Sequence, residues 1–136
     1  MTIGDGKHPR AGILFVLATK WIVKSIDPIM DNQWQKPLLE NLECMQMKDI
    51  DAINQIDFEN YQIVLIIGVH SHADLYESKR QIQMKTNAKI IMLYIPCCKG
   101  IPRQLRNHKP IIDKLDDAIP SSKNRVLVWK FGFETK

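Results

Sequence analysis

No stretch of the sequence approaches the ~20 consecutive apolar residues that a membrane-spanning helix needs. The first ten residues contain no apolar core of the kind found in a signal peptide. The three cysteines are an odd number, and Cys97 and Cys98 are adjacent, which does not fit a disulfide framework. Together these absences predict a cytoplasmic protein with no membrane span, in a reducing compartment.

The usual sequence signatures of nucleic-acid binding are also missing. No basic run is interleaved with aromatic residues, and no zinc-finger spacing occurs, so nucleic acid is not an expected partner. The net charge of +4 is unevenly spread: residues 21–62 hold three lysines and eight acidic residues, and residues 99–136 hold nine basic and four acidic ones. The basic C-terminal third is either a solvated surface or one that faces phosphates or an acidic partner.

The length of 136 residues corresponds to one domain and is too short for a barrel enzyme of roughly 250 residues. Residues 1–11 are polar and contain Gly4, Gly6 and Pro9, so we expect a flexible N-terminal lead-in there. We expect residues 12–136 to form a single α/β domain.

Continuous apolar runs predict buried strands of the kind found in parallel sheets. They lie at residues 12–17, 61–68, 89–95 and 125–131, with a weaker candidate at 44–48. Helices are expected between them: from an N-cap at Asp27-Pro28 to residue 43 with a kink at Pro37, at 51–56, from a capping box of Ser71 and Asp74 to about residue 85, and at 110–118. A loop or short helix is expected at 100–110.

Apolar strands that alternate with helices predict an α/β fold. The expected architecture is a single Rossmann- or flavodoxin-like, doubly wound and mainly parallel sheet of about five strands, with helices on both faces. Ligands of such sheets bind beyond the carboxyl ends of the strands. The loops expected at that edge contain the candidate ligand-binding residues Thr19, Lys20, His70, Ser71, His72, Cys97 and Lys99.

Two histidines two positions apart stand at the end of a predicted strand. The stretch 68–74 resembles the metal-binding loop of amidohydrolases, but Gly68 stands where that family has an aspartate, and the chain is too short for that family's barrel. A zinc site of His70, His72 and a cysteine of the 97–98 pair is one alternative, and a loop with a helix cap is the other. The expected function needs no metal and no cofactor.

Cys97 and Cys98 suggest a second kind of chemistry. Lys99 beside them would favour a thiolate, and His70 is a candidate base for a nucleophilic cysteine. The alternative is a pair of small buried side chains at a strand end. Lys20 could meet a phosphate or carboxylate, but residues 18–21 contain no glycine to bring the backbone close to a pyrophosphate.

The centre of the chain, from Tyr61 to Ile95, resembles a response-regulator receiver domain. It has the order strand, loop, helix, and then the residues Ala-Lys-Ile-Ile-Met-Leu at 88–93. Gly68 and Val69 stand where that family has its phospho-acceptor aspartate, and no acidic pair follows residues 12–17. This resemblance implies a signalling or partner-binding module rather than a phospho-receiver.

A second resemblance covers more of the chain. Residues 88–96 (Ala-Lys-Ile-Ile-Met-Leu-Tyr-Ile-Pro), Gly-Ile-Pro at 100–102, Lys-Leu-Asp-Asp-Ala-Ile at 114–119 and Lys-Phe-Gly-Phe-Glu at 130–134 are similar to the N-terminal, acceptor-side half of GT-B glycosyltransferases. The sequence departs from that family in having residues 120–129 before Lys-Phe-Gly, no glycine-rich turn after residues 12–17, and no donor-binding domain with its catalytic acid.

Two functions therefore stay open. The resemblance implies a glycosyltransferase-like domain that binds a sugar or nucleotide-sugar acceptor and needs a second domain or a protein partner for transfer. The alternative is a non-catalytic Rossmann- or receiver-like regulatory module that binds a small ligand or a protein partner. No pair of a general acid and a general base can be assigned from the sequence for either function.

Overall fold

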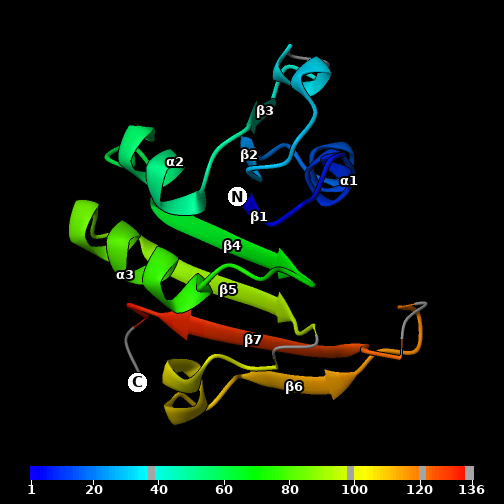
Figure 1. Cartoon of the computed structure of the whole chain (residues 1–136). Helices are drawn as coiled ribbons and strands as arrows, with labels where there is room; N and C mark the ends of the chain where they lie inside the picture. The colour runs from blue at the N-terminus through cyan, green and yellow to red at the C-terminus, as the bar shows by residue number, and fades with distance from the viewer. Residues whose placement is uncertain (37–38, 98–99, 120–121, 134–136) are drawn as a thin grey trace.

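The computed structural model describes residues 1–36, 39–97, 100–119 and 122–133. Over these residues the chain forms an α/β fold with one seven-stranded mixed sheet (Figure 1). The strands are β1 (Thr2–Ile3), β2 (Val23–Ile26), β3 (Leu42–Met45), β4 (Ile63–Val69), β5 (Lys89–Ile95), β6 (Ile112–Leu115) and β7 (Arg125–Phe131). The helices are α1 (Arg10–Ala18), α2 (Asp49–Gln55) and α3 (Leu75–Lys85), with short 3₁₀ turns η1 (Asn32–Gln35) and η2 (Arg103–Asn107).

The strands follow one another across the sheet in the order β3-β2-β1-β4-β5-β7-β6. Strands β1 to β5 pair in parallel, whereas β7 runs antiparallel between β5 and β6. Figure 1 shows β4 and β5 pointing one way and β7 the other. The predicted α/β class is confirmed, but among the described residues the sheet is larger than the expected five strands and is partly antiparallel.

The N-terminal residues form the centre of the sheet rather than a lead-in to it. Thr2 and Ile3 are almost fully buried, and β1 lies between β2 and β4. The amino group of Met1 donates a hydrogen bond to the carbonyl oxygen of Leu65 at 2.6 Å, and burial lowers the pKa of this amine to about 5. Although β1 has only two residues, it pairs with β2 on one side and with β4 on the other, and these neighbours bury both residues.

The apolar run at 12–17 belongs to α1, so the prediction of a first strand there was wrong. A short apolar run is compatible with a buried strand and with a helix, and periodicity alone does not separate them. Gly12 decides the packing: a Cβ at this position would lie 3.0 Å from the Cβ of Ser25 and 3.3 Å from Leu42. The glycine therefore lets α1 approach β2 and β3 closely.

The helix predicted from Asp27 to residue 43 was also wrong. Asp27 follows β2, and Met30 donates back to the Asp27 carbonyl in a turn. Among the described residues between Asp27 and the start of β3 at Leu42, only η1 is helical. Pairing with β2 along its whole length holds β3 in the extended conformation. The strand predicted at 44–48 therefore exists but begins two residues earlier. The predicted kink at Pro37 lies outside the described residues.

The elements of the middle of the chain and the last strand were predicted well. The helix at 51–56, the strands at 61–68 and 89–95 and the last strand at 125–131 correspond to α2, β4, β5 and β7. The predicted capping box at the start of α3 is half confirmed. The Asp74 carboxylate accepts from the amides of Tyr76 and Glu77, whereas the Ser71 hydroxyl accepts from Ala73 outside the helix.

The segment predicted as a helix at 110–118 contains β6 instead. Its register with β7 places Asp113 opposite Leu127, and the Arg125 guanidinium donates two hydrogen bonds to the Asp113 carboxylate at 2.8 and 2.7 Å. All four residues of β6 are exposed. An exposed edge strand carries no alternation of buried and polar residues, so the sequence pattern could not distinguish it from a surface helix.

The main core lies between the sheet and α2 and α3, which cover the same face. Its fully buried side chains include Ile53, Ile66, Ile82, Met92 and Tyr94. Helix α1 packs on β2 and β3 from the opposite face through Gly12, next to Ser25. No helix within the described ranges is long and apolar enough to cross a membrane.

Candidate functional site

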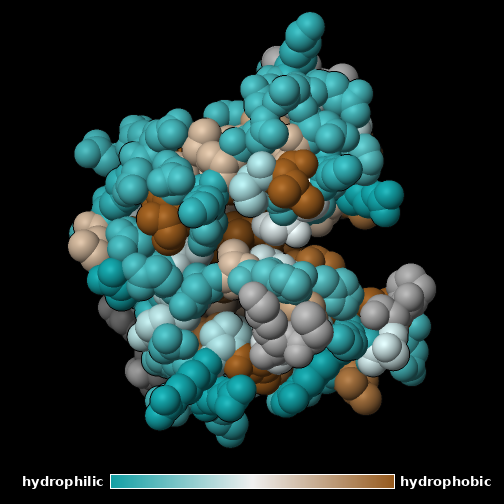
Figure 2. All heavy atoms as spheres, viewed as in Figure 1, coloured by the Kyte–Doolittle hydropathy of each residue, from teal (hydrophilic) through white to brown (hydrophobic). Residues whose placement is uncertain are grey.

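A cavity of about 410 Å³ opens at the edge of the sheet where the parallel strands β1, β2 and β4 end. We call it the edge cavity. It is lined by Gly4, Asp27, Pro28, Ile29, Lys48, Asp49, His70, Ser71, His72 and Ala73. These residues come from four loops that are distant in sequence, and parallel packing of the strands brings the loops to one edge. Seen as in Figure 1, the surface is mostly hydrophilic and is hollowed between its upper and lower parts (Figure 2).

The loop from β1 to α1 carries two glycines with left-handed backbone angles. Gly4 has φ 77° and Gly6 has φ 79°, values that favour glycine over residues with a Cβ. A Cβ on Gly4 would lie 2.8 Å from the Cβ of Ser71, which is buried at the end of β4. Gly4 therefore lets the first loop touch the loop after β4, and this contact forms one wall of the edge cavity.

Asp5, between the two glycines, occupies the N-terminus of α1. Its carboxylate accepts hydrogen bonds from the backbone amides of Ala11 and Gly12, both at 2.9 Å. The hydroxyls of Thr2 and Ser25 donate to the same carboxylate at 3.0 and 2.8 Å. The amides that would bind an external anion at a helix N-terminus are thus already bound to a side chain of the protein.

Asp27 stands directly after β2 and is 7% exposed. One carboxylate oxygen accepts from the Gly6 amide at 2.8 Å, and the other accepts from the Ile29 amide at 2.9 Å. A carboxylate has about four lone-pair positions, so each oxygen can accept a further hydrogen bond from a ligand. Asp27 therefore both fixes the glycine loop and presents a fixed acceptor to the edge cavity.

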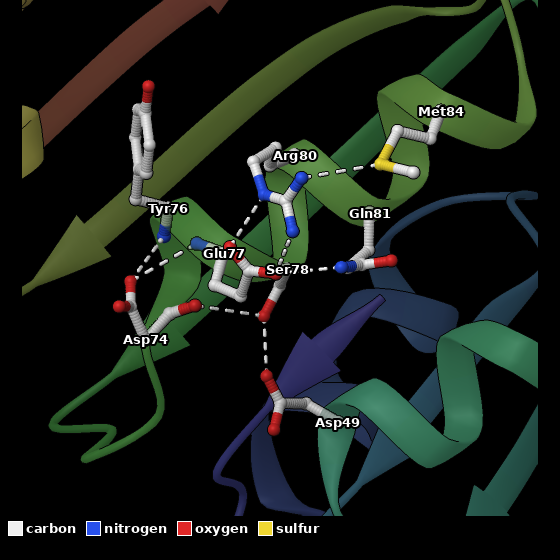
Figure 3. Close-up of polar contacts among 8 residues, drawn as sticks. All are labelled: Asp49, Asp74, Tyr76, Glu77, Ser78, Arg80, Gln81 and Met84. Carbon is white, nitrogen blue, oxygen red and sulfur yellow. Dashed lines mark hydrogen bonds and ion pairs between the residues drawn. The ribbon is translucent and has the colours of Figure 1, made fainter.

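Asp49, at the start of α2, brings a second carboxylate to the edge cavity. Figure 3 shows Ser78 between this residue and the carbonyl of Asp74 on its own helix. The fully buried Ser78 hydroxyl donates to Asp49 at 2.5 Å. This contact joins α3 to α2 and sets the orientation of the Asp49 side chain. Lys48, beside Asp49, contributes a positive charge to the same lining.

His70 is the only non-glycine residue with a positive φ in the described part of the chain, at 52°. Its amide donates to the Ile95 carbonyl, and its ring nitrogen Nδ1 lies 3.2 Å from the Pro96 carbonyl oxygen. A carbonyl oxygen only accepts, so Nδ1 is the ring nitrogen that donates in this contact. Nε2 of His70 is therefore the ring nitrogen that can accept a hydrogen bond from a ligand.

The loops after β4 and β5 are joined beneath the cavity. The Tyr94 hydroxyl lies 3.5 Å from the carbonyl oxygen of Ser71 and 3.2 Å from that of Gly100. The Cys97 thiol donates to the Ser71 carbonyl at a sulfur–oxygen distance of 3.7 Å. The structure thus brings together His70, Ser71 and Cys97, three of the residues that the sequence placed at one edge.

Thr19 and Lys20 do not reach this site, although the sequence placed them there. They follow α1 and precede β2, so they lie toward the opposite edge of the sheet. The Thr19 hydroxyl donates to the Phe15 carbonyl at 2.8 Å and accepts from the Trp21 amide. The placement depended on the strand predicted at 12–17, and it changes because that segment is a helix.

His72 lines the edge cavity as predicted, but the proposed zinc alternative finds no third ligand in the part of the chain that the structure describes. No three histidine, cysteine or acidic side chains gather there in a way that could hold a metal ion. Cys98 and Lys99 lie outside the described residues. Cys44 is the other described cysteine; burial first, and then the carboxylates of Asp5 and Glu43, raise the pKa of its thiol and disfavour a thiolate.

Sequence reasoning missed the residues of the first loop and of β2. Gly4, Gly6 and, about 20 residues later, Asp27 match the first two glycines and the acidic residue of the pattern in nucleotide-binding βαβ units, whereas Pro9 stands at the position of the third glycine. A first strand predicted at 12–17 places the glycine-rich turn after those residues. The glycines precede α1 instead of following a strand at 12–17. Asp49 gives no such signal, since only the fold brings it to the cavity.

Comparisons with known proteins add no family to this description. No protein-family model matches the chain, and neither a curated protein nor a solved structure matches it.

Proposed function

We propose that the fold is of the Rossmann type and that the edge cavity binds a nucleoside. The order β3-β2-β1-β4-β5 is the order of the strands around a Rossmann nucleotide site, which lies beside the central β1. The edge cavity lies at the carboxyl ends of β1, β2 and β4, which is where such folds hold their ligands. Its volume of about 410 Å³ falls within the range of small-molecule sites.

Asp27 supports a ribose as part of the ligand. In Rossmann sites an acidic residue after the second strand accepts hydrogen bonds from the ribose hydroxyls. Asp27 has this position and lines the edge cavity. The hydrogen bonds from Gly6 and Ile29 hold its carboxylate in place before a ligand arrives.

The position of Asp5 supports a ligand without phosphate groups. In dinucleotide sites the pyrophosphate binds to the N-terminal amides of the helix that follows β1. Here the Asp5 carboxylate binds those amides at 2.9 Å, and its negative charge repels a phosphate group. The site therefore favours a nucleoside whose attached group is neutral or positively charged.

S-Adenosylmethionine is the common biological nucleoside that meets this requirement, because its sulfonium is positive and it has no phosphate. The antiparallel β7 between β5 and β6 adds a fold-level analogy, since methyltransferases that use this compound typically share the strand order of this sheet. When bound, S-adenosylmethionine supplies an activated methyl group. We therefore propose S-adenosylmethionine-dependent methyl transfer as the function of the chain.

Each residue of this proposed site has a separate role. Asp27 would hold the ribose, and Asp49 adds a second acceptor at the same cavity. Asp5 compensates the positive end of α1 and excludes phosphate. His70 presents Nε2 as an acceptor for an N–H or O–H group of a methyl acceptor.

The sugar-binding, glycosyltransferase-like function stays a prediction. A nucleotide-sugar ligand of the kind that this prediction includes carries a pyrophosphate, which Asp5 disfavours at α1. The two functions therefore predict different ligands for one cavity, and a binding experiment separates them.

The test is isothermal titration calorimetry of the full chain with S-adenosylmethionine and, separately, with UDP-glucose. We expect S-adenosylmethionine to bind with a micromolar Kd and UDP-glucose not to bind. Asp27→Asn removes the negative charge from the ribose acceptor and should weaken S-adenosylmethionine binding at least tenfold. Asp57→Asn, the same substitution before β4 at the other edge of the sheet, serves as the matched control and should leave the affinity within twofold.

Circular dichroism of both variants establishes that they are folded before binding is compared. Binding of UDP-glucose in place of S-adenosylmethionine would overturn the proposal and favour the glycosyltransferase-like function. Equal losses in the Asp27 and Asp57 variants would also contradict it, because they would show that the effect does not arise at the edge cavity.

A further inference from the structure

A second cavity lies beside the first, at the same edge of the sheet. It has a volume of about 430 Å³, and we call it the basic cavity. Arg106, Lys123 and Arg125 surround it, and Pro96, Cys97 and Ile101 form much of the rest of its lining. No acidic side chain is among its lining residues in the described part of the chain. Nothing in the proposed nucleoside site uses these three cations.

The three cations come from different elements. Arg106 belongs to η2, whereas Lys123 and Arg125 come from the connection into β7 and from its first residue. The Arg106 Nε donates to the carbonyl of Ile101 at 3.1 Å, which fixes the guanidinium at the cavity without neutralising its charge. Asp113 pairs with Arg125 from the neighbouring strand, so the charge of Arg125 is partly compensated.

The antiparallel β7 explains why these charges gather at the ligand edge. Because β7 runs opposite to β5, its first residues lie next to the end of β5. The basic C-terminal third, with its nine basic and four acidic residues at 99–136, thereby brings positive charge to this edge. On a solvated surface the basic residues would be spread over the protein, whereas these three cations surround one cavity.

The linings of the two cavities are in contact, and we call the residues that join them the wall between the cavities. Ser71 lines the edge cavity, and Cys97 and Gly100 line the basic cavity. Hydrogen bonds from Cys97 to the Ser71 carbonyl, and from Tyr94 to the carbonyls of Ser71 and Gly100, hold this wall together. A molecule in the basic cavity would therefore lie next to a ligand in the edge cavity.

We propose that the basic cavity binds a phosphate-bearing organic molecule, with its apolar part against Ile101 and Pro96 and its phosphate among the three cations. Arginine and lysine suit phosphate oxygens, and arginine does so through paired N–H groups. The assignment of this molecule as the methyl acceptor rests on the proposed function. Binding of a phosphate-bearing molecule in the basic cavity does not rest on the proposed function, so either statement can be wrong while the other is right.

The probe is phenyl phosphate, titrated into the ¹⁵N-labelled full chain and followed by amide chemical shifts. Phenol and inorganic phosphate, titrated in parallel, separate the ring from the phosphate. We expect phenyl phosphate to shift the amides of Ile101, Arg106, Lys123 and Arg125, and to bind at least fivefold more tightly than either fragment. Raising the salt concentration should weaken it, because screening reduces the attraction of exposed charges.

The variant Arg106→Gln/Lys123→Gln should weaken phenyl phosphate at least tenfold. The matched control, Arg103→Gln/Lys109→Gln, removes the same charge from residues flanking Arg106 that do not line the cavity, and should change the affinity less than twofold. Equal losses in both variants would overturn the proposal, as would tight binding of phenol alone.

S-Adenosylmethionine is titrated into the same variants to keep the two proposals apart. We expect its affinity to be unchanged in both. If the wild-type chain binds phenyl phosphate in this way but not S-adenosylmethionine, the basic cavity stands and the methyl-transfer function fails. If it binds S-adenosylmethionine but phenyl phosphate shifts no amide of the basic cavity, the reverse holds.

Discussion

At the scale of single residues, Gly4 and Asp5 determine what the first loop can do. Asp5 bridges β1, β2 and α1 with four hydrogen bonds, so one carboxylate organises the loop and occupies the N-terminal amides of α1. Gly4 permits the loop to contact Ser71. The two neighbouring residues thus connect the shape of the edge cavity to its chemistry.

Substitution of Gly4 should show both costs of a side chain at this position. Gly4→Ala adds a Cβ in a left-handed conformation and places it against buried Ser71. Gly6→Ala is the matched control, since Gly6 has nearly the same φ but nothing within 4 Å of an added Cβ. We expect Gly6→Ala to cost about 1–2 kcal/mol from backbone strain alone, and Gly4→Ala to cost about 1–3 kcal/mol more from overpacking.

Urea denaturation followed by circular dichroism measures both free energies of unfolding in the absence of ligand. Equal costs for the two variants would contradict the close contact between the β1 and β4 loops. Backbone strain affects both Gly4 and Gly6, whereas the steric contact with Ser71 exists only at Gly4. The difference between the two costs therefore measures that contact.

At the scale of elements, α3 connects the core to the site. Its N-terminus is capped by Asp74, and Ser78 holds Asp49 of α2 (Figure 3). On its exposed side the Glu77 carboxylate accepts two hydrogen bonds from Arg80 and one from Gln81. The hydrogen bonds from Arg80 first, and then that from Gln81, lower the pKa of Glu77 from 4.5 to about 2.

The lowered pKa of Glu77 gives α3 a pH dependence with a defined sign. The folded state prefers the charged carboxylate, so its contribution is complete above pH 4.5 and is lost as the pH falls toward 2. Glu77→Gln should therefore be less stable than the wild type at pH 7, and the difference should shrink between pH 4.5 and 3. Urea midpoints of both proteins at these pH values measure it. A difference that stays constant over this range would contradict the role of the charge.

The elements also show what the sequence could predict. Strands β4 and β5, α3 and β7 have long apolar runs or a capping residue, and these local signals agree with the tertiary structure. The predictions for residues 12–17 and 110–118 were wrong because tertiary contacts determine the structure of both segments. Gly12 lets α1 pack closely on β2 and β3, and pairing with β7 holds β6 in the extended conformation. Because the first strand is predicted at 12–17, Thr19 and Lys20 are predicted at the wrong edge of the sheet. His70, Ser71 and His72 follow a correctly predicted strand and line the edge cavity.

At the scale of the whole molecule, cavities open at both edges of the sheet. The edge cavity and the basic cavity contain charged side chains. A cavity of about 310 Å³ at the other edge is lined mainly by apolar residues, including Trp21, Ile22 and Phe58. Two further cavities at that edge carry charged side chains, so charge alone does not distinguish the two edges. The edge cavity and the basic cavity lie at the carboxyl ends of the parallel strands, which is where such sheets place their ligands.

Helix α1 contributes little of its apolar surface to the interior. Leu14 and Leu17 are 68% and 69% exposed, and Gly12 is the fully buried residue of the helix. Leu14→Lys/Leu17→Lys keeps helix propensity similar and removes exposed apolar surface. We expect it to change the free energy of unfolding by no more than about 0.5 kcal/mol per substitution.

Chemical denaturation tests this expectation, with Ile53→Ala as the contrasting variant. Ile53 is fully buried between α2 and the sheet, so its truncation should cost about 2–5 kcal/mol. A loss of similar size from the two lysines would show that Leu14 and Leu17 are packed in solution rather than exposed.

The central position of β1 also constrains how the chain folds. The hydrogen bond from the Met1 amine to Leu65 spans 64 residues, and β1 separates the pair β2 and β3 from the remaining strands. Strand β1 must wait for β4 before the middle of the sheet can close. Closure of so long a loop is entropically costly, and topologies rich in such distant pairings fold slowly. Until that pairing forms, the two halves of the sheet each expose an unpaired strand edge, the kind of surface on which chains associate with one another.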